Sequence, residues 1–364
     1  MRYTMEDFMI EAPKIARQNV ENRKELTKQF VEIFNSGKYE RITMVACGSS
    51  YNIANNAKYF MQKFLRMPVS IIWSETFLLY DLDLVDSKTF VIFMSQSGHS
   101  TNTIAAAKLL KERGIDAIAL TNFPDSPIRE HVKAAIPYGS TLNDLFVAKG
   151  FIISTLFLML ASLEVSAFQK KITNKEYEYT IRQISKAIEK LDESRKLGEE
   201  FYFNHKTLCQ EMYRTIVVGC GPTYATGLEG CLKLTENYGC ASTAFEVDEF
   251  YHGPDIEVTK DVTVIYVDGA NESPIHSRIL QSYEGVKHLT DRRIILTHDE
   301  SVSGDYVIRF KDEGIEDYIA VLYLVCPFQY WAHKITEELR CQAWTRNVFA
   351  YGKVMKTKVP GVRY

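Results

Sequence analysis

Short apolar runs alternate with longer amphipathic stretches along most of the chain. The apolar runs predict buried strands at Ile42–Ala46, Thr89–Met94, Ala117–Leu120, Thr215–Val218, Val262–Val267 and Arg293–Leu296. Helical spacing of apolar residues predicts helices at Met5–Asn35, Tyr51–Phe64, Thr101–Arg113, Ala225–Tyr238, Pro274–Leu289 and Tyr318–Cys341. Strands that are apolar throughout and alternate with helices are typical of parallel sheets covered on both faces, so the fold class is α/β.

One short phrase occurs twice. Val-Ala-Cys-Gly-Ser-Ser-Tyr at Val45–Tyr51 returns 173 residues later as Val-Gly-Cys-Gly-Pro-Thr-Tyr at Val218–Tyr224. Each copy follows a predicted strand and opens a predicted helix, which indicates two related α/β domains. The predicted organisation is a helical segment (1–35), a first domain (36–172), a helical linker (173–205), a second domain (206–341) and a C-terminal tail (342–364).

Composition narrows the class of protein. The chain is 46% hydrophobic and 24% charged with a net charge of −3, and no basic stripe suggests nucleic-acid binding. Its seven cysteines are scattered and lack C-x-x-C spacing, which favours reduced thiols in a cytoplasmic protein over disulfides or a zinc site. The longest apolar stretch, Phe151–Leu163, is 13 residues, whereas a membrane span needs about 20. We therefore expect a buried helix there and no membrane association.

Two loops of the first half follow predicted strands and precede helices. Because ligands of open parallel sheets bind beyond the carboxyl ends of the strands, both loops are candidate ligand sites. Glycine permits close backbone approach, hydroxyls donate hydrogen bonds, and helix N-termini attract anions. The pattern favours phosphate binding, although serine and glycine also occur as simple helix caps and turns. The candidates are Cys47, Gly48, Ser49, Ser50, Ser95, Gln96, Ser97 and Ser100. Neither a P-loop nor a complete dinucleotide fingerprint is present.

The second half lacks the serine loop. At the same offset it carries the acidic segment Asp268–Ser273, which would repel phosphate. Its predicted helix instead carries Glu229, Lys233 and Glu236 at spacings of four and three, so that they share one face. The alternative interpretation is a surface salt-bridge ladder. His252 precedes Gly-Pro and is expected near the end of a short helix, where it projects into a cleft or serves only the structure.

Three motifs in this order resemble the sugar isomerase (SIS) superfamily. They are Ser-Gln-Ser-Gly-His-Ser-Thr-Asn-Thr (95–103), Glu-Gly-Cys-Leu-Lys-Leu-Thr-Glu (229–236) and His-Gly-Pro (252–254). More narrowly, the chain resembles the double-SIS isomerase part of glucosamine-6-phosphate synthase, the amino-sugar-phosphate deaminases and the fructosamine-6-phosphate deglycases. The resemblance implies two SIS domains, each a doubly wound parallel sheet flanked by helices. His99 stands where the synthase has a glutamate, and Tyr-His-Gly-Pro is closer to the deglycases.

The resemblance also implies roles for individual residues. The serines and Gln96 of the two loops would bind the 6-phosphate and the sugar hydroxyls. Glu236 would move a proton between C1 and C2, Lys233 would tune it, and His252 would assist ring opening from the neighbouring subunit of a homodimer. The tail would close the active site, with Lys353 as the first candidate to reach the sugar carbonyl and Lys356 as the second.

The expected function follows from this resemblance. We expect a cytoplasmic enzyme, a deglycase or deaminase of 6-phosphorylated fructosamines or amino sugars, that needs no metal or other cofactor. The partners expected are a small sugar phosphate and a second copy of the chain. Aldose–ketose isomerisation or glucosamine-6-phosphate deamination is the alternative within the same class. A sugar-phosphate sensor without catalysis is the alternative from another class, and it would have no use for Glu236 or His252.

Overall fold

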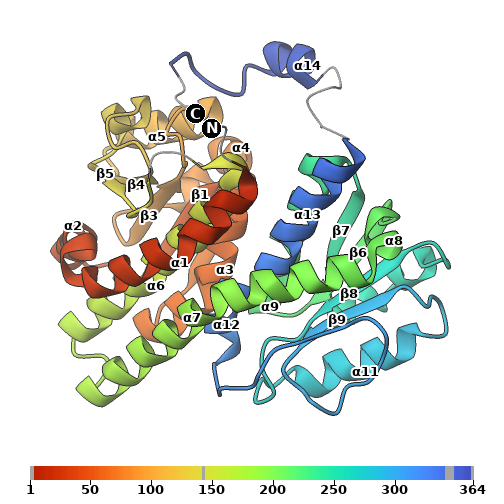
Figure 1. The fold of residues 1–364 in the computed structure, drawn as a ribbon. Helices are drawn as coiled ribbons and strands as arrows, with labels where there is room; N and C mark the ends of the chain where they lie inside the picture. Colours follow the sequence, from red (N-terminus) through yellow and green to blue (C-terminus); the bar gives the residue numbers. More distant parts are fainter. Residues whose placement is uncertain (1–3, 142–143, 341–347, 362–364) are drawn as a thin grey trace. The chain divides into compact units, whose positions relative to one another are not determined.

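The computed structural model describes residues 4–141, 144–340 and 348–361, which form two compact units (Figure 1). The first-sheet unit comprises Lys14–Ile181 with Asn347–Tyr364, and the second-sheet unit comprises Met1–Pro13 with Arg182–Arg346. The predicted domain boundaries remain predictions. The two units differ from the predicted domains mainly in the ends of the chain. The first residues belong to the second-sheet unit, and the C-terminal tail belongs to the first-sheet unit. Positions 342–347 and 362–364 of the predicted tail lie outside the described residues.

The first sheet is parallel, with the strand order β2-β1-β3-β4-β5. Its strands are β1 (Arg41–Ala46), β2 (Val69–Trp73), β3 (Thr89–Met94), β4 (Ala117–Thr121) and β5 (Ala134–Pro137). The α-helices of eight or more residues with residues in this unit are α1 (Met5–Glu21), α2 (Arg23–Ser36), α3 (Ser49–Leu65), α5 (Thr101–Glu112), α6 (Ala148–Phe168), α7 (Asn174–Asn204) and α14 (Val348–Met355). Helices α1 and α7 also have residues in the second-sheet unit.

Both faces of the first sheet are covered. On one face, Phe93 of β3 packs edge-to-face with Phe77 at 6.1 Å between ring centroids, within a core cluster that includes Ala106 of α5. On the other face, Phe90 of the same strand packs against Phe30 of α2 at 5.5 Å. The alternation of side chains along β3 thus serves two cores, which explains why this strand is apolar throughout.

Helix α6 is the apolar helix predicted from its central 13 residues. It is long and apolar enough to cross a membrane by length and composition, but 83% of its most apolar window is buried within the structure. Ser166 of this helix donates a 2.6 Å hydrogen bond to the carbonyl of Phe64 at the end of α3. These contacts are those of a core helix.

The second sheet is also parallel, with the order β10-β9-β8-β6-β7. Its strands are β6 (Arg214–Gly219), β7 (Ala241–Glu246), β8 (Thr263–Val267), β9 (Arg293–Thr297) and β10 (Val307–Arg309). Its remaining α-helices are α8 (Lys206–Gln210), α9 (Pro222–Tyr238), α10 (Val247–Phe250), α11 (His276–Val286), α12 (Asp317–Leu324) and α13 (Cys326–Leu339). The predicted single helix over 318–341 is therefore two helices, which meet where Pro327 removes a backbone donor.

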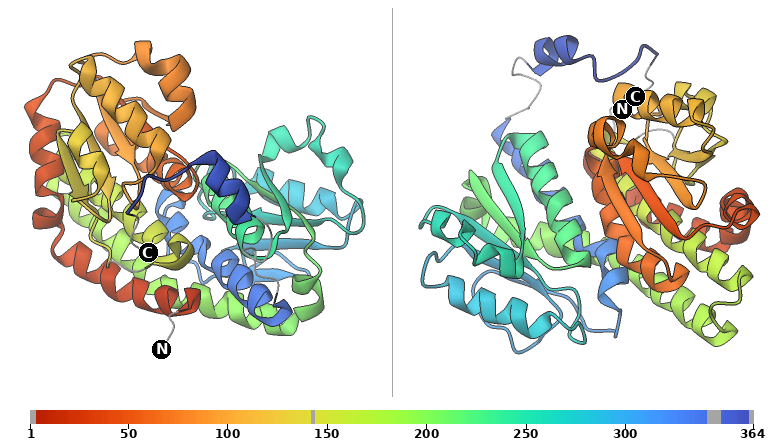
Figure 2. Two further views of the ribbon diagram at one scale, coloured as in Figure 1. Left: turned by 90° about the horizontal axis from the view of Figure 1, so that it is seen from above. Right: turned by 180° about the vertical axis from the view of Figure 1, so that it is seen from behind.

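Two cores also flank the second sheet. Val218 and Tyr266 pack with Ile279 and Tyr283 of α11 on one face, and the view from behind in Figure 2 shows α11, in cyan, beside that sheet. On the other face α9 lies so close to β6 that a Cβ at Gly227 would sit 3.1 Å from Val217. The close approach of α9 holds its side chains in fixed positions.

The repeat predicted from the sequence is a repeat of structure. Strands β1 and β6, and helices α3 and α9, begin and end at positions separated by 173 residues. The pairing registers agree as well, because Ala46 pairs with Trp73 and Gly219 pairs with Glu246, again at that offset. The two-domain α/β prediction is therefore confirmed, and the corresponding positions of the two units can be compared directly.

Candidate functional site

The two predicted phosphate loops lie at the same edge of the first sheet. Strands β1 and β3 are parallel neighbours, so the loops that follow them leave the sheet side by side. Gly48 takes a φ of 61° at the start of α3, and Ser100 precedes α5. Asn102 joins the two segments, because its Nδ2 lies 3.5 Å from Cys47 Sγ.

The polar groups of the serine loop differ in exposure. Ser95 is buried, and its hydroxyl lies 3.4 Å from that of Ser100. Gln96, Ser97 and Ser100 are half-buried. In the first loop Ser49 is buried, Ser50 is half-buried, and Cys47 and Gly48 are exposed. Hydroxyls at the mouth of two helix N-termini are the arrangement expected for an anion site.

The tail contributes a cation that the sequence analysis did not single out. Lys358 Nζ lies 2.9 Å from Ser100 Oγ and 3.2 Å from Ser97 Oγ. The earlier tail candidates, Lys353 and Lys356, have exposed side chains with no described hydrogen bond to this loop. The sequence signal that could have indicated Lys358 is weak: it is the second of two lysines, separated by one residue, that precede Val-Pro.

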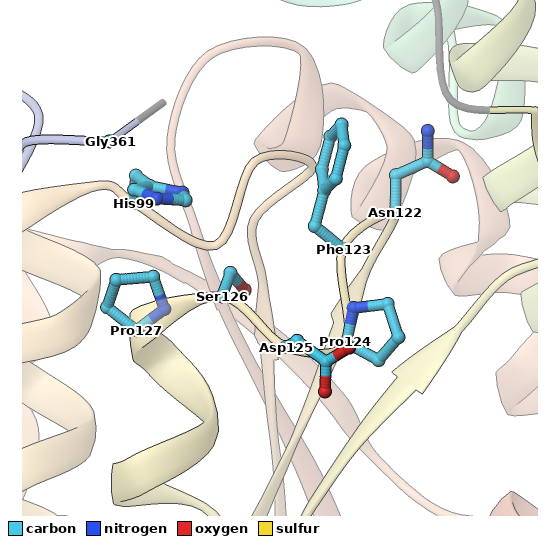
Figure 3. A pocket seen from close by; sticks show the side chains of 8 residues that line it. All are labelled: His99, Asn122, Phe123, Pro124, Asp125, Ser126, Pro127 and Gly361. Carbon is cyan, nitrogen blue, oxygen red and sulfur yellow. The ribbon is translucent and has the colours of Figure 1, made fainter. Parts of the chain in front are cut away.

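A pocket of about 390 Å³ adjoins the serine loop. Figure 3 shows its lining side chains, which are His99, Asn122, Phe123, Pro124, Asp125, Ser126, Pro127 and Gly361. His99 is fixed there because its Nδ1 contacts the Ser97 carbonyl oxygen at 2.5 Å. Gly98 takes a φ of 64°, and any Cβ there would collide with Ser126. This part of the loop is therefore tightly constrained.

The second glycine turn is occupied by the protein's own carboxylate. Glu246, at the end of β7, accepts a 3.1 Å hydrogen bond from the Gly221 amide. Burial, reinforced by this carboxylate, raises the pKa of Cys220 to about 11. At the corresponding position the first unit has Trp73, which stacks on Tyr51 at 4.9 Å and carries no acceptor group. An internal anion in the second turn disfavours an added phosphate there.

Helix α9 brings its three charged residues together. Lys233 and Glu229 are fully buried, with Nζ 3.0 Å from Glu229 Oε1, and Lys233 also lies 2.5 Å from Glu236 Oε1. Burial lowers the pKa of Lys233, but the two carboxylates outweigh it and the net shift is upward. The interpretation as a surface salt-bridge ladder is wrong, because two of the three groups have no exposed surface.

Glu236 has the properties of an accessible base. Its side chain keeps 32% of its surface exposed. Burial raises the pKa of its carboxyl, and the Lys233 ammonium opposes that shift. The corresponding positions of α3 are Asn56, Phe60 and Lys63, so the acidic cluster belongs to α9 alone of the two related helices. Only this unit pairs a reachable carboxylate with a buried ammonium at this place in the repeat.

His252 lies where the sequence predicted, just beyond the short helix α10. Its backbone amide bonds to the Glu249 carbonyl at 3.0 Å, and Gly253 follows with a φ of 128°. The imidazole is exposed and makes no hydrogen bond with the part of the second-sheet unit that the structure describes. Its role stays a prediction. Among the described residues, no group of three histidine, cysteine or acidic side chains is arranged to hold a metal ion.

Comparisons with known proteins show which proteins this chain is similar to. The SIS domain family model matches residues 37–165. Over 347 residues the chain is 24% identical to the glutamine–fructose-6-phosphate aminotransferase (isomerizing) of Brucella abortus, covering 91% of this chain and 55% of that protein. The chain thus spans about half the length of the curated relatives it matches.

Solved structures with the same fold carry several activities in their names. A proposed phosphosugar isomerase of Clostridium difficile 630 superposes with a TM-score of 0.88 at 20% identity, covering 99% of this chain and 100% of that one. Glucosamine-6-phosphate deaminase of Thermotoga maritima superposes with a TM-score of 0.67 at 17% identity, covering 96% and 98%. At these identities the likeness establishes the fold and leaves the substrate open.

Proposed function

We propose that this chain, whose residues 37–165 match the SIS domain family model, is a phosphosugar enzyme that deglycates or deaminates a 6-phosphorylated fructosamine or amino sugar. The observation that carries the proposal is Glu236, a half-buried carboxylate beside a fully buried ammonium on a rigidly packed helix. A sensor of sugar phosphates would need the serine loops and would have no use for such a base. The proposed site residues therefore include both binding and proton-transfer groups.

The serine loops of the first-sheet unit bind the 6-phosphate in this proposal. Ser97 and Ser100 donate their hydroxyl hydrogens, and the N-termini of α3 and α5 supply backbone N–H groups. The phosphate is remote from the reacting carbons, so its binding anchors the substrate and aligns those carbons for reaction. Phosphate recognition by itself is shared by every candidate activity.

Glu236 performs the proton transfer. In a fructosamine the nitrogen is on C1 and the carbonyl on C2, and the carboxylate removes a C1 proton and returns it to C2. The C1–N bond thereby becomes an imine, and water hydrolyses it to an aldose phosphate and a free amine. Lys233 holds the carboxylate in place and counters the negative charge that develops as the proton is removed.

Deamination is the second reaction that the proposal covers, and one observation supports it. The fold is shared with a protein named as a glucosamine-6-phosphate deaminase. With nitrogen on C2, the same base would move a proton from C2 to C1, and hydrolysis would release ammonia and a ketose phosphate. Simple aldose–ketose isomerisation would use the same proton shift and release no amine.

The remaining roles belong to the proposal as well. His252 assists ring opening and is contributed by the second subunit of a homodimer, and Lys353 reaches the sugar carbonyl from the tail. The exposed imidazole is compatible with a contact made by another copy of the chain. The protein is proposed to work in the cytoplasm.

The products distinguish these candidates. The purified protein is incubated with 6-phosphorylated fructosamines, glucosamine 6-phosphate and fructose 6-phosphate, and aldose phosphate, ketose phosphate, ammonia and organic amine are measured separately. The proposal expects amine and aldose phosphate in equal amounts from a fructosamine, or ammonia and ketose phosphate from glucosamine 6-phosphate. Sugar-phosphate binding without turnover of any of these compounds would support a sensor instead.

A further inference from the structure

The described end of the tail pairs with the serine loop through an isolated antiparallel bridge. Ser100 and Lys358 form an antiparallel bridge. On either side of it, the Val359 amide donates to the His99 carbonyl at 2.9 Å and the Thr101 amide donates to the Thr357 carbonyl at 3.2 Å. The Thr101 hydroxyl adds a 2.8 Å bond to the Lys356 carbonyl. These bonds fix the backbone on both sides of Lys358, so its side chain has a defined place.

That place lies among the phosphate loops. The Lys358 ammonium donates to Ser100 at 2.9 Å and to Ser97 at 3.2 Å, and the buried Ser95 hydroxyl lies 3.4 Å from Ser100. The Lys358 side chain as a whole is exposed. Partial desolvation of its ammonium beside the loop lowers its pKa, and the neighbouring Cys47 of the other loop opposes that shift. Among the described residues, the hydrogen bonds of this ammonium go to hydroxyls and none goes to a carboxylate, so its positive charge is available to a bound anion.

We propose that Lys358 is a phosphate-binding residue that makes the site selective for phosphorylated over unphosphorylated sugars. A hydroxyl has one hydrogen to donate and two lone pairs to accept. Because the ammonium takes a lone pair on Ser97 and on Ser100, their hydrogens are left to point toward a bound anion. Lys358 therefore orients two donors and supplies the positive charge that the serine loops themselves lack. This inference rests on the proposed function, since it assumes a phosphorylated substrate.

The test compares binding of fructose 6-phosphate and of fructose by titration calorimetry. The variants are Lys358→Gln, Lys358→Arg and the matched control Lys108→Gln, which removes the same charge from an exposed position of α5 in the same unit. Because a charge-assisted hydrogen bond is among the stronger ones, Lys358→Gln is expected to weaken fructose 6-phosphate binding by about tenfold or more. Lys358→Arg is expected to stay within about threefold of the wild type, and Lys108→Gln to bind as the wild type does.

Measuring both fructose 6-phosphate and fructose distinguishes failure of the proposed role of Lys358 from failure of the proposed function. Binding of fructose should be equal in all variants, which shows that the site itself is intact. If the wild type prefers the phosphorylated sugar and Lys358→Gln keeps that preference, the role of Lys358 is rejected while the proposed function stands. If the wild type binds both sugars alike, the phosphosugar function is rejected, and the role of Lys358 with it.

Discussion

The backbone amide of Gly221 donates a hydrogen bond of 3.1 Å to the carboxylate of Glu246. In the related unit the corresponding position is Trp73, so the two glycine turns share a backbone and differ in what faces them. One turn opens toward serine hydroxyls and the other is filled by an internal anion. The duplicated architecture has thus been specialised by a side chain on a neighbouring edge strand.

Removing this carboxylate should destabilise the second-sheet unit. Glu246→Ala leaves the Gly221 amide without its acceptor, and we expect the free energy of unfolding to fall by about 1–3 kcal/mol. Urea unfolding measures the change, with the exposed neighbour Glu249→Gln as a control expected within about 0.5 kcal/mol of the wild type. Equal stability of the two variants would mean that Glu246 is not a structural cap of the turn.

The buried charges of α9 should depend on one another. Lys233→Met leaves Glu229 fully buried without its ammonium partner, and we expect a loss of about 3–5 kcal/mol of stability. Adding Glu229→Gln to that variant removes the unpaired charge and should recover a large part of the loss. A double-mutant cycle by denaturant unfolding measures the coupling. Additive losses would show that the pair does not interact as its 3.0 Å separation implies.

The acid limb of the pH–rate profile should lie at a higher pH than an ordinary glutamate would give. Burial raises the pKa of Glu236 above 4.5, and a base works only when deprotonated, so kcat/KM should rise with pH through that raised value. The same shift favours the protonated carboxyl in the folded state. That contribution to stability is full below the unfolded pKa and is lost as pH rises through the folded pKa. A pH–rate profile with its limb at or below 4.5 would contradict the assignment.

The proposed shared site predicts complementation between two inactive variants. If His252 acts on the substrate held by the neighbouring subunit, mixing Glu236→Gln with His252→Ala subunits should form some sites that contain both intact groups. Random exchange makes about half of the dimers mixed, and one of the two sites in each mixed dimer has both groups intact. About a quarter of all sites are then intact, so roughly a quarter of the wild-type activity is expected. Assays before and after subunit exchange measure the gain. Persistent inactivity after proven exchange would place both groups in one chain.

The fold could be predicted for the strands buried on both sides. Strands β1, β3, β4, β6, β8 and β9 lie inside the two sheets, and each was predicted within a residue or two. The edge strands β2, β5, β7 and β10 were not predicted. Their residues are partly exposed, as in Ala241–Glu246, so they lack the continuous apolar run that marks an interior strand.

The candidate site was predictable where local sequence determines it. Serines at helix N-termini and the spacing of Glu229, Lys233 and Glu236 are local patterns. Glu246 and Lys358 escaped notice because their partners come from strand pairing that only the folded chain reveals. The tail segment is a particular case, since an isolated bridge of few residues leaves no periodicity in the sequence.

The central claim is that Glu236 carries the C1–C2 proton, and its amide variant tests this most directly. Glu236→Gln keeps the shape and an acceptor for Lys233, so thermal stability and binding of a sugar phosphate should stay close to the wild type. We predict that kcat falls by at least about a hundredfold, the range of a lost general base, while the exposed control Glu300→Gln remains active. A Glu236→Gln protein that binds and turns over substrate at the wild-type rate would contradict the account.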